Sequence, residues 1–338
     1  MELAEAVDEA RINRILQEVA GEPTKEEVKI ILDKAMEKKG LLLTEAAKLL
    51  NVEDREAMQL MFNASSKIKQ EIYGNRLVWF APIYLSNYCV NSCAYCGFSA
   101  SNLSLKRKRL TIKEVAEQTR ALIKMGHKRL LVETGESEVA SPIEYVVECI
   151  REIYATKEGR GEIRRVNVNI AATSTENYRK LKEAGIGTYQ LFQETYHKET
   201  YEKMHRGPKG DYYRQLTAHC RAFEAGLDDY GMGVLFGLYN YKFEIIALLS
   251  HAKWMEKKFG VGPHTISVPR IKPAAGVCFK PPFPVSDSDF LKAIAVYRLA
   301  VPYTGMIIST REPPEIREKA FEIGISQASV GSRTSPGG

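Results

Sequence analysis

Residues 78–98 read VWFAPIYLSNYCVNSCAYCGF, a short apolar run followed at once by three closely spaced cysteines. The run at 78–84 is rich in β-branched and aromatic residues, which predicts a buried strand. Cys89, Cys93 and Cys96 fall within eight residues, whereas the other three cysteines lie far from them and from one another. In a reducing compartment such a cluster indicates metal binding or redox chemistry rather than a disulfide framework.

Downstream of this run, short apolar segments alternate with longer segments of helical period. Eight short runs are predicted as strands, at 78–84, 129–133, 166–171, 189–192, 231–236, 265–268, 306–309 and 325–329. Seven amphipathic segments between them are predicted as helices, at 112–125, 143–154, 175–183, 212–224, 244–257, 287–299 and 315–321. Eight strands with intervening helices in roughly 260 residues fit a closed (β/α)8 barrel of the TIM type better than an open doubly wound sheet.

Residues 1–75 show no strand pattern and are predicted to form an N-terminal helical extension. Thr24 and Glu27 have the spacing of a capping box, which predicts that a helix begins there. The barrel is predicted over residues 76–338. No amphipathic segment follows the eighth strand before Gly338, so the eighth helix is missing and we expect the natural polypeptide to continue into an auxiliary domain.

The composition is that of an ordinary soluble chain. It has 338 residues, 44% of them hydrophobic, and a formal net charge of +6. No run approaches the ~20 apolar residues of a membrane span, and the acidic start MELAEAVDEA is unlike a secretory signal, so we expect a cytoplasmic protein with no membrane partner. The excess charge is too small and too dispersed to indicate nucleic acid, and the basic run at 106–109 is interpreted as a solvated turn.

The cysteine loop has the spacing Cys-x3-Cys-x2-Cys, with Tyr95 and Phe98 beside its last cysteine. Three thiolates on one loop hold three corners of a 4Fe-4S cluster and leave the fourth iron without a protein ligand. Zinc is the alternative, but structural zinc takes four protein ligands, and no paired Cys or His accompanies the loop. The pattern therefore favours a 4Fe-4S cluster on Cys89, Cys93 and Cys96.

This loop resembles the signature of the radical S-adenosylmethionine (SAM) superfamily, in which SAM chelates the open iron. Longer strings narrow the resemblance to the aromatic amino acid lyases of that superfamily. The strings are YLSNYC at 84–89, CGFS at 96–99, ETGE at 133–136, YQLFQETYH at 189–197, VPR at 268–270 and STRE at 309–312. This family includes the tyrosine lyase of iron-iron hydrogenase maturation and 2-iminoacetate synthase of thiamine biosynthesis. The segment GPHTIS at 262–267 looks more like the first.

Ligand-binding residues of a barrel lie at the carboxyl ends of its strands, so the cysteine loop, Gly135, Glu136, Glu194 and Arg311 are expected at one mouth. Glycine permits a close backbone approach, and a carboxylate pairs with an ammonium. The resemblance implies that Gly135 and Glu136 bind the methionyl amine of SAM and that Glu194 contacts the same cofactor.

Other residues are assigned to the pockets by the resemblance. Tyr95 and Phe98 are implied to flank SAM, and Tyr84 is implied to face the substrate, with plain core packing as its alternative. Arg214 is a candidate partner of the SAM carboxylate, with a surface charge as its alternative. The glycine-rich run at 231–237 fits either an adenine resting on backbone or simple strand packing.

Arg311 is the predicted substrate anchor, because a guanidinium at the barrel mouth matches an α-carboxylate bidentately. An ion pair with Glu312 or Glu315 is the alternative. Ser309 and Ser329 are predicted to add hydroxyl donors to the same carboxylate.

His264 opens the sixth predicted strand, where a satisfied core histidine is the ordinary interpretation. In the hydrogenase-maturing lyases, the resemblance implies that this histidine faces an extra iron on an auxiliary cluster. That cluster is held by a C-terminal Cys-x2-Cys and one further cysteine, none of which occurs in this sequence. His264 is retained as a candidate metal ligand.

The resemblance implies an enzyme that cleaves SAM reductively and removes a hydrogen atom from the amine of L-tyrosine. The Cα-Cβ bond then breaks to give p-cresol and dehydroglycine, a precursor of carbon monoxide and cyanide for the hydrogenase cluster. The implied partners are L-tyrosine, a reduced donor such as ferredoxin or flavodoxin, and other hydrogenase maturases. Two alternatives stay open, a 2-iminoacetate synthase and a non-catalytic iron-sulfur or zinc scaffold.

Overall fold

The computed structural model describes residues 2–330 and 335–336, and its centre is a closed barrel of eight parallel strands. The barrel strands are β1 (Val78–Ser86), β2 (Arg129–Thr134), β5 (Arg165–Asn169), β6 (Tyr189–Gln190), β7 (Tyr230–Gly233), β8 (Thr265–Ser267), β9 (Gly305–Ser309) and β10 (Gln327–Ser329). Each predicted strand overlaps one of them, so the predicted barrel is confirmed.

The barrel closes through β1, which pairs with strands from both ends of the series. Tyr84 of β1 lies beside Glu133 of β2, and Phe80 of β1 lies beside Ser329 of β10. All barrel pairs are parallel, so the carboxyl ends of the strands lie at one end of the barrel. That end holds the loops discussed below.

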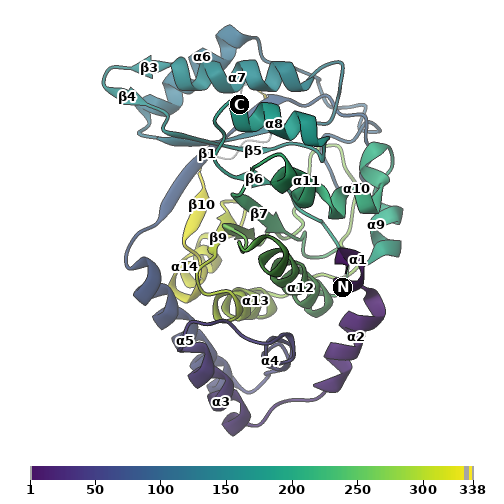
Figure 1. Ribbon diagram of the computed structural model, residues 1–338, viewed down its shortest axis with the longest axis vertical. Coiled ribbons are helices and arrows are strands. Elements are labelled where there is room, and N and C mark those ends of the chain that lie inside the picture. Colours follow the sequence, from purple (N-terminus) through teal and green to yellow (C-terminus); the bar gives the residue numbers. More distant parts are fainter. Residues whose placement is uncertain (1, 331–334, 337–338) are drawn as a thin grey trace.

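Helices surround the barrel on its outer side (Figure 1). They are α6 (Ile112–Lys124), α7 (Ile143–Ala155), α8 (Thr175–Glu183), α9 (Lys198–Met204), α10 (Tyr212–Leu216), α11 (Ala218–Glu224), α12 (Tyr241–Phe259), α13 (Asp287–Ala300) and α14 (Pro314–Ile323). The single helix predicted over 212–224 is wrong, because the chain bends at Thr217, whose hydroxyl donates to the carbonyl of Tyr213.

Three short elements were not predicted. Helix α9 and the 3-10 turn η1 (Pro208–Gly210) lie between β6 and α10, and a small hairpin joins β3 (Lys157–Glu158) to β4 (Gly161–Glu162). Each is too short to show a hydrophobic period in sequence.

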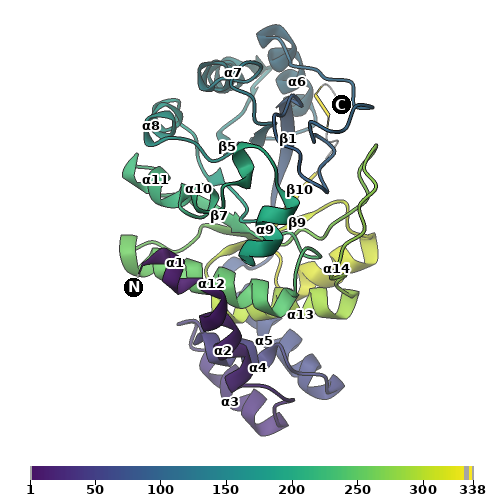
Figure 2. The ribbon, with the colours of Figure 1, turned by 90° about the vertical axis from the view of Figure 1, so that its right-hand side faces the viewer.

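Over the part of the chain that the structure describes, five helices precede the barrel. They are α1 (Leu3–Ala6), α2 (Glu9–Glu18), α3 (Lys25–Ala35), α4 (Leu43–Leu49) and α5 (Arg55–Tyr73). Of these, α1 lies beside α12 and the others extend below α12 and α13 (Figure 1, Figure 2). The capping box predicted at the start of α3 is present, with Thr24 and Glu27 each accepting from the other's backbone N–H. Gly40 lies at φ +80°, and a Cβ there would lie 2.7 Å from the carbonyl oxygen of Ala300 in α13.

One apolar core joins these N-terminal helices to α12, α13 and the strands β7 to β10, and a second lies between β1, β2, β5 and helices α6 to α8. Helices α12 and α13 are therefore buried on most sides, so their buried residues are not confined to one face. In the described part of the chain, no helix is both long enough and apolar enough to cross a bilayer. Of the three isolated cysteines, Cys149 is buried, Cys220 is partly buried and Cys278 is exposed.

Candidate active site

The cysteine loop follows β1 and is tied back to the segment that comes after it by Arg107. The Arg107 guanidinium donates to the carbonyl of Asn87 at 2.6 Å, and it also donates to Phe98 at 2.8 Å and Ser99 at 2.6 Å. The interpretation of 106–109 as a solvated turn is therefore wrong for Arg107. Arg109 is exposed, in agreement with that interpretation, and its guanidinium lies 3.8 Å from the ring centroid of Tyr145.

The segment between α9 and η1 packs on the other side of the cysteine loop. The backbone N–H of Ser92 donates to Arg206, and that of Ala94 donates to Met204, both at 3.0 Å. The hydroxyl of Tyr95 lies 2.8 Å from Nε2 of His205. Nδ1 of His205 lies 2.7 Å from the carbonyl oxygen of Tyr201, which can only accept, so the ring proton is on Nδ1. Nε2 therefore accepts from the Tyr95 hydroxyl. Burial lowers the pKa of His205 to about 4, which keeps the ring neutral.

Two of the three cysteine sulfurs, those of Cys96 and Cys89, accept from N–H donors of the loop. The backbone N–H of Phe98 donates to Sγ of Cys96 at 3.4 Å, and the side-chain amide of Asn91 donates to Sγ of Cys89 at 3.7 Å. Burial raises the pKa of Cys93 to about 12 and also raises that of Cys96, so thiolates here require a bound cation. Among the described residues, no group of three or more His, Cys, Asp or Glu side chains is arranged to hold a single metal ion.

These features fit an iron-sulfur cluster. N–H groups directed at ligating sulfurs are one of the levers by which proteins tune such clusters. In this arrangement Cys89, Cys93 and Cys96 would hold three irons, and the loop offers no fourth cysteine.

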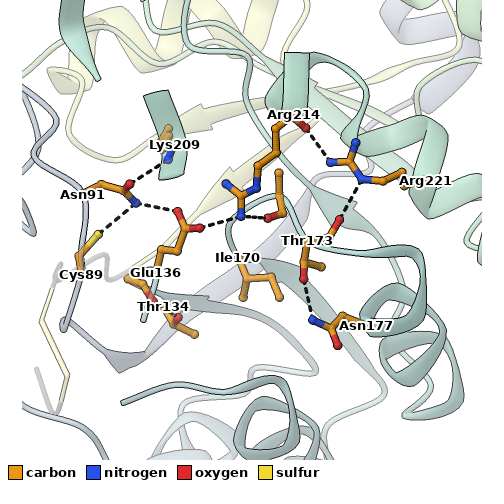
Figure 3. A network of polar contacts seen from close by, with 12 residues as sticks. Cys89, Asn91, Thr134, Glu136, Ile170, Thr173, Asn177, Lys209, Arg214 and Arg221 are labelled. Carbon is orange, nitrogen blue, oxygen red and sulfur yellow. Dashed lines mark hydrogen bonds and ion pairs between the residues drawn. The ribbon is translucent and has the colours of Figure 1, made fainter. Parts of the chain in front are cut away.

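Glu136 follows β2 and lies in a polar network that reaches the cysteine loop (Figure 3). Its Oε2 accepts from Nδ2 of Asn91 at 2.6 Å, and its Oε1 accepts from Nη2 of Arg214 at 2.7 Å. Arg214 also donates to the carbonyl of Ala172. Thus two predicted SAM-binding residues, Glu136 and Arg214, are side by side, and Arg214 is not the free surface charge that its helix position suggested.

Gly135 brings the β2 loop against the cysteine loop. A Cβ at this position would lie 2.3 Å from the carbonyl oxygen of Tyr88 and 3.1 Å from Cβ of Cys89. As expected, the backbone at Gly135 approaches another segment closely. That segment is the start of the cysteine loop.

Glu194 follows β6 in the left-handed conformation, at φ +67°, which is uncommon for a residue other than glycine. Its Oε1 accepts from Nζ of Lys209 at 2.6 Å. The side chains of Glu194 and Lys209 are 12% and 21% exposed, so the ion pair is largely withdrawn from water.

A cavity of about 130 Å³ opens at the same end of the barrel. Tyr84, Ser309, Arg311 and Ser329, the predicted substrate residues, all line it. The backbone N–H of Arg311 donates to the hydroxyl of Ser309 at 3.3 Å. The alternative ion pair with Glu312 is not formed, because that carboxylate is held by Arg270 and Lys272.

The cavity has an apolar floor and a polar rim. Phe80, Leu131 and Ile307 pack together on the floor. Glu133 faces the rim beside Tyr84, and burial raises its pKa to about 7 despite the opposing hydrogen bond from Tyr84 and the charge of Arg311. Glu133 is the first residue of the ETGE string at 133–136, and its burial beside Tyr84 is not evident from the sequence.

His264 lies away from this mouth. It immediately precedes β8, and its carbonyl accepts from the N–H of Gly305 at the start of β9, so it belongs to the amino ends of the strands. Its Nδ1 is 3.9 Å from Oδ2 of Asp229, and its side chain is 48% exposed. His264 is therefore not the satisfied core histidine that we weighed, and it does not join the three cysteines.

The run at 231–237 contributes to strand packing at two of its glycines. A Cβ on Gly231 would lie 2.5 Å from Oγ1 of Thr265, and one on Gly233 would lie 2.7 Å from the ring of Phe192. Among the other predicted residues, the ring of Phe98 packs edge-on against Tyr84, with 5.8 Å between centroids.

Three residues of the site were not predicted from sequence, namely Asn91, Arg107 and Lys209. The sequence feature that could have indicated a loop at Lys209 is the turn sequence Gly-Pro-Lys-Gly at 207–210. It lies downstream of Glu194, before the next predicted helix. Asn91 lies inside the cysteine motif, but its spacing gives no indication of its partners.

Comparisons with known proteins agree with this geometry. Residues 83–251 match the model of the radical SAM superfamily, and residues 267–337 match the biotin and thiamin synthesis associated domain. A crystal structure of HydG, described as a maturase of the [FeFe]-hydrogenase, is 56% identical, with a TM-score of 0.97 over 99% of this chain and 74% of that one. The FeFe-hydrogenase maturase HydG of Carboxydothermus hydrogenoformans is 43% identical, with a TM-score of 0.92 over 100% of this chain and 78% of its own.

A curated relative has a different activity in its name. The 2-iminoacetate synthase of Salmonella typhimurium is 31% identical over 86% of this chain and 75% of its own. The same assignment follows from the superfamily model, from these identities and from the cysteine loop at the mouth of a closed barrel. This chain therefore belongs to the radical SAM superfamily.

Proposed function

We propose that this chain is a radical SAM tyrosine lyase of [FeFe]-hydrogenase maturation, which cleaves the Cα-Cβ bond of L-tyrosine to p-cresol and dehydroglycine. The observation that carries the proposal is the 56% identity to HydG across 99% of the chain. The 31% identity to 2-iminoacetate synthase is much lower.

The shape and chemistry of the cavity support an aromatic amino acid as substrate. The floor of Phe80, Leu131 and Ile307 suits an aromatic ring, and Arg311 at the rim suits a carboxylate. Ser309 supports the loop that carries Arg311 through its hydrogen bond. Holding the substrate by both ends limits its motion and fixes its amine with respect to the cofactor side of the mouth.

When bound, the 4Fe-4S cluster and SAM supply one-electron cleavage of the sulfonium bond and a 5'-deoxyadenosyl radical. The chain's own residues bind and orient these groups. Cys89, Cys93 and Cys96 would hold the cluster, and Glu136, Arg214 and Glu194 would hold SAM. We also propose a low-potential donor such as ferredoxin or flavodoxin and functional partnership with other hydrogenase maturases.

The test is anaerobic reconstitution of the chain with iron and sulfide, followed by dithionite, SAM and L-tyrosine. We expect p-cresol and 5'-deoxyadenosine to form together. Formation of 5'-deoxyadenosine without p-cresol would reject tyrosine as the substrate and keep the superfamily chemistry.

A second candidate is 2-iminoacetate synthase, which the Salmonella typhimurium relative favours. Both enzymes would release p-cresol, so that product does not separate them. Carbon monoxide and cyanide among the products would support the maturase, and dehydroglycine that is not converted further would support the synthase.

A further inference from the structure

Lys209 is a partly buried cation beside the cysteine loop, and the reaction described above gives it no role. Its side chain is 21% exposed, and its Nζ donates to Oε1 of Glu194 at 2.6 Å. Its backbone N–H donates to Oδ1 of Asn91 at 2.9 Å, and its carbonyl accepts from the hydroxyl of Tyr201 at 2.6 Å. The residue is thus fixed at both its main chain and its side chain.

The anchoring of Lys209 belongs to the packing of the whole segment on the cysteine loop. Asn91 is 1% exposed, and the same side chain that holds Lys209 also donates to Cys89 and Glu136 (Figure 3). Gly207 makes this contact possible, because it lies at φ +92° and a Cβ there would lie 2.8 Å from Oδ1 of Asn91. The position of Lys209 is therefore set relative to the cysteines rather than by solvent.

Lys209 carries a positive charge in a segment that is anchored to the cysteine loop. Burial by itself would lower the pKa of Lys209, but Glu194 and Cys93 outweigh this effect and raise it, so the ammonium stays charged. Nζ of Lys209 is paired with the Glu194 carboxylate, and its backbone is held by Asn91, whose side-chain amide also donates to Sγ of Cys89.

We propose that Lys209 is a positioning residue with two effects. It supplies a fixed positive charge that favours reduction of the cluster on Cys89, Cys93 and Cys96. It also orients Glu194 toward SAM. The inference rests on the cluster and not on tyrosine, so it does not depend on the substrate given under the proposed function.

The physical reason is that reduction adds one negative charge to a site that already carries three thiolates. In a poorly solvated environment a nearby fixed cation stabilises the reduced state more than the oxidised state. The second effect follows from geometry. Lys209 occupies Oε1 of Glu194, which fixes the carboxylate and directs Oε2 elsewhere, and it balances a charge that would be costly to bury alone.

The experiment compares Lys209→Met with Lys209→Arg in the anaerobically reconstituted protein. Lys203→Met is the matched control, because Lys203 lies in the neighbouring helix α9 and is exposed. Two quantities are measured, the midpoint potential of the cluster by an EPR-monitored redox titration and the dissociation constant of SAM. Neither depends on turnover.

We expect Lys209→Met to shift the potential to a more negative value, with about tenfold less reduced cluster at a fixed potential, or ~59 mV for one electron. SAM should bind at least tenfold more weakly. Lys209→Arg should restore most of the potential because it keeps the charge, and Lys203→Met should match the parent protein in both measurements.

A variant of the partner carboxylate keeps the test decisive if Lys209→Met does not take up a cluster. Glu194→Gln leaves Lys209 charged and unpaired, so its potential should shift in the opposite direction, to a more positive value. Unchanged potentials in Glu194→Gln and in any Lys209 variant that takes up a cluster would overturn the proposal. So would a potential in Lys209→Arg as low as that of Lys209→Met, since charge would then not be the cause.

Discussion

At the scale of single residues, Glu244 shows how burial controls ionisation. It lies in α12 and is 1% exposed, and its carboxylate accepts hydrogen bonds from the Thr195 hydroxyl and, at 2.8 Å, from the backbone N–H of Tyr196. Burial raises its pKa to about 8 in spite of these two hydrogen bonds. The folded protein therefore binds a proton here at pH values where an unfolded chain, with a carboxyl pKa near 4.5, has released it.

This difference predicts a pH dependence of stability. Between about pH 4.5 and pH 8 unfolding releases the Glu244 proton, so the contribution of this residue to stability is complete below pH 4.5 and falls by about 1.4 kcal/mol per pH unit up to pH 8. In Glu244→Gln this dependence should be absent. Urea unfolding from pH 5 to pH 9 measures it, and parallel curves for the two proteins would contradict the assignment.

Gly135 gives a second prediction at this scale. Gly135→Ala places a methyl group 2.3 Å from the carbonyl oxygen of Tyr88, so the cysteine loop must move. We expect the variant to fold but to hold less than half of the iron of the parent protein after reconstitution. Gly262→Ala is the control, because its nearest neighbour would be 4.0 Å away. Full iron content in Gly135→Ala would show that the loop adapts.

At the scale of elements, the cysteine loop depends on contacts from segments far away in sequence. Arg107 holds its carbonyls from one side, and the segment between α9 and η1 holds its backbone from the other. A loop with no regular structure keeps its shape only if such partners satisfy its polar groups.

Arg107→Lys should therefore fail to replace the parent residue. A single ammonium cannot reproduce the planar set of donors that reaches Asn87, Phe98 and Ser99. We expect a loss of roughly 1–3 kcal/mol in unfolding free energy and faster removal of iron by a chelator. The exposed neighbour Lys106 serves as the control in Lys106→Met. Equal rates of iron loss in both variants would rule out this role for Arg107.

Elements with a regular pattern of hydrophobic residues could be predicted from the sequence. Contacts between loops could not, because no such pattern marks them. The strands were predictable because parallel strands buried on both faces are continuous apolar runs, and the cysteine loop because its spacing is chemically restrictive. Lys209 and Arg107 were not, since their roles come from carbonyls and carboxylates that only the folded loops bring near. The bend at Thr217 was missed because helical patterns continue on both sides of it.

At the scale of the whole molecule, the order of the strands places the site at one end of the barrel. Parallel pairing throughout brings the cysteine loop, Glu136, Glu194 and Arg311 to the carboxyl ends, as the barrel prediction required. The same rule places His264 at the amino ends. The N-terminal helices share their core with α12 and α13.

The pairing of β1 with β10 has a consequence for biosynthesis. Val78 lies beside Gln327, so the strand that leads to the cysteine loop finds its second neighbour only after Gln327 has left the ribosome. Until then one edge of β1 is unpaired, next to the metal-binding segment. Iron and sulfide delivered during translation would thus reach the cysteine loop while the barrel is still open. Iron and sulfide delivered later would reach it in a closed barrel.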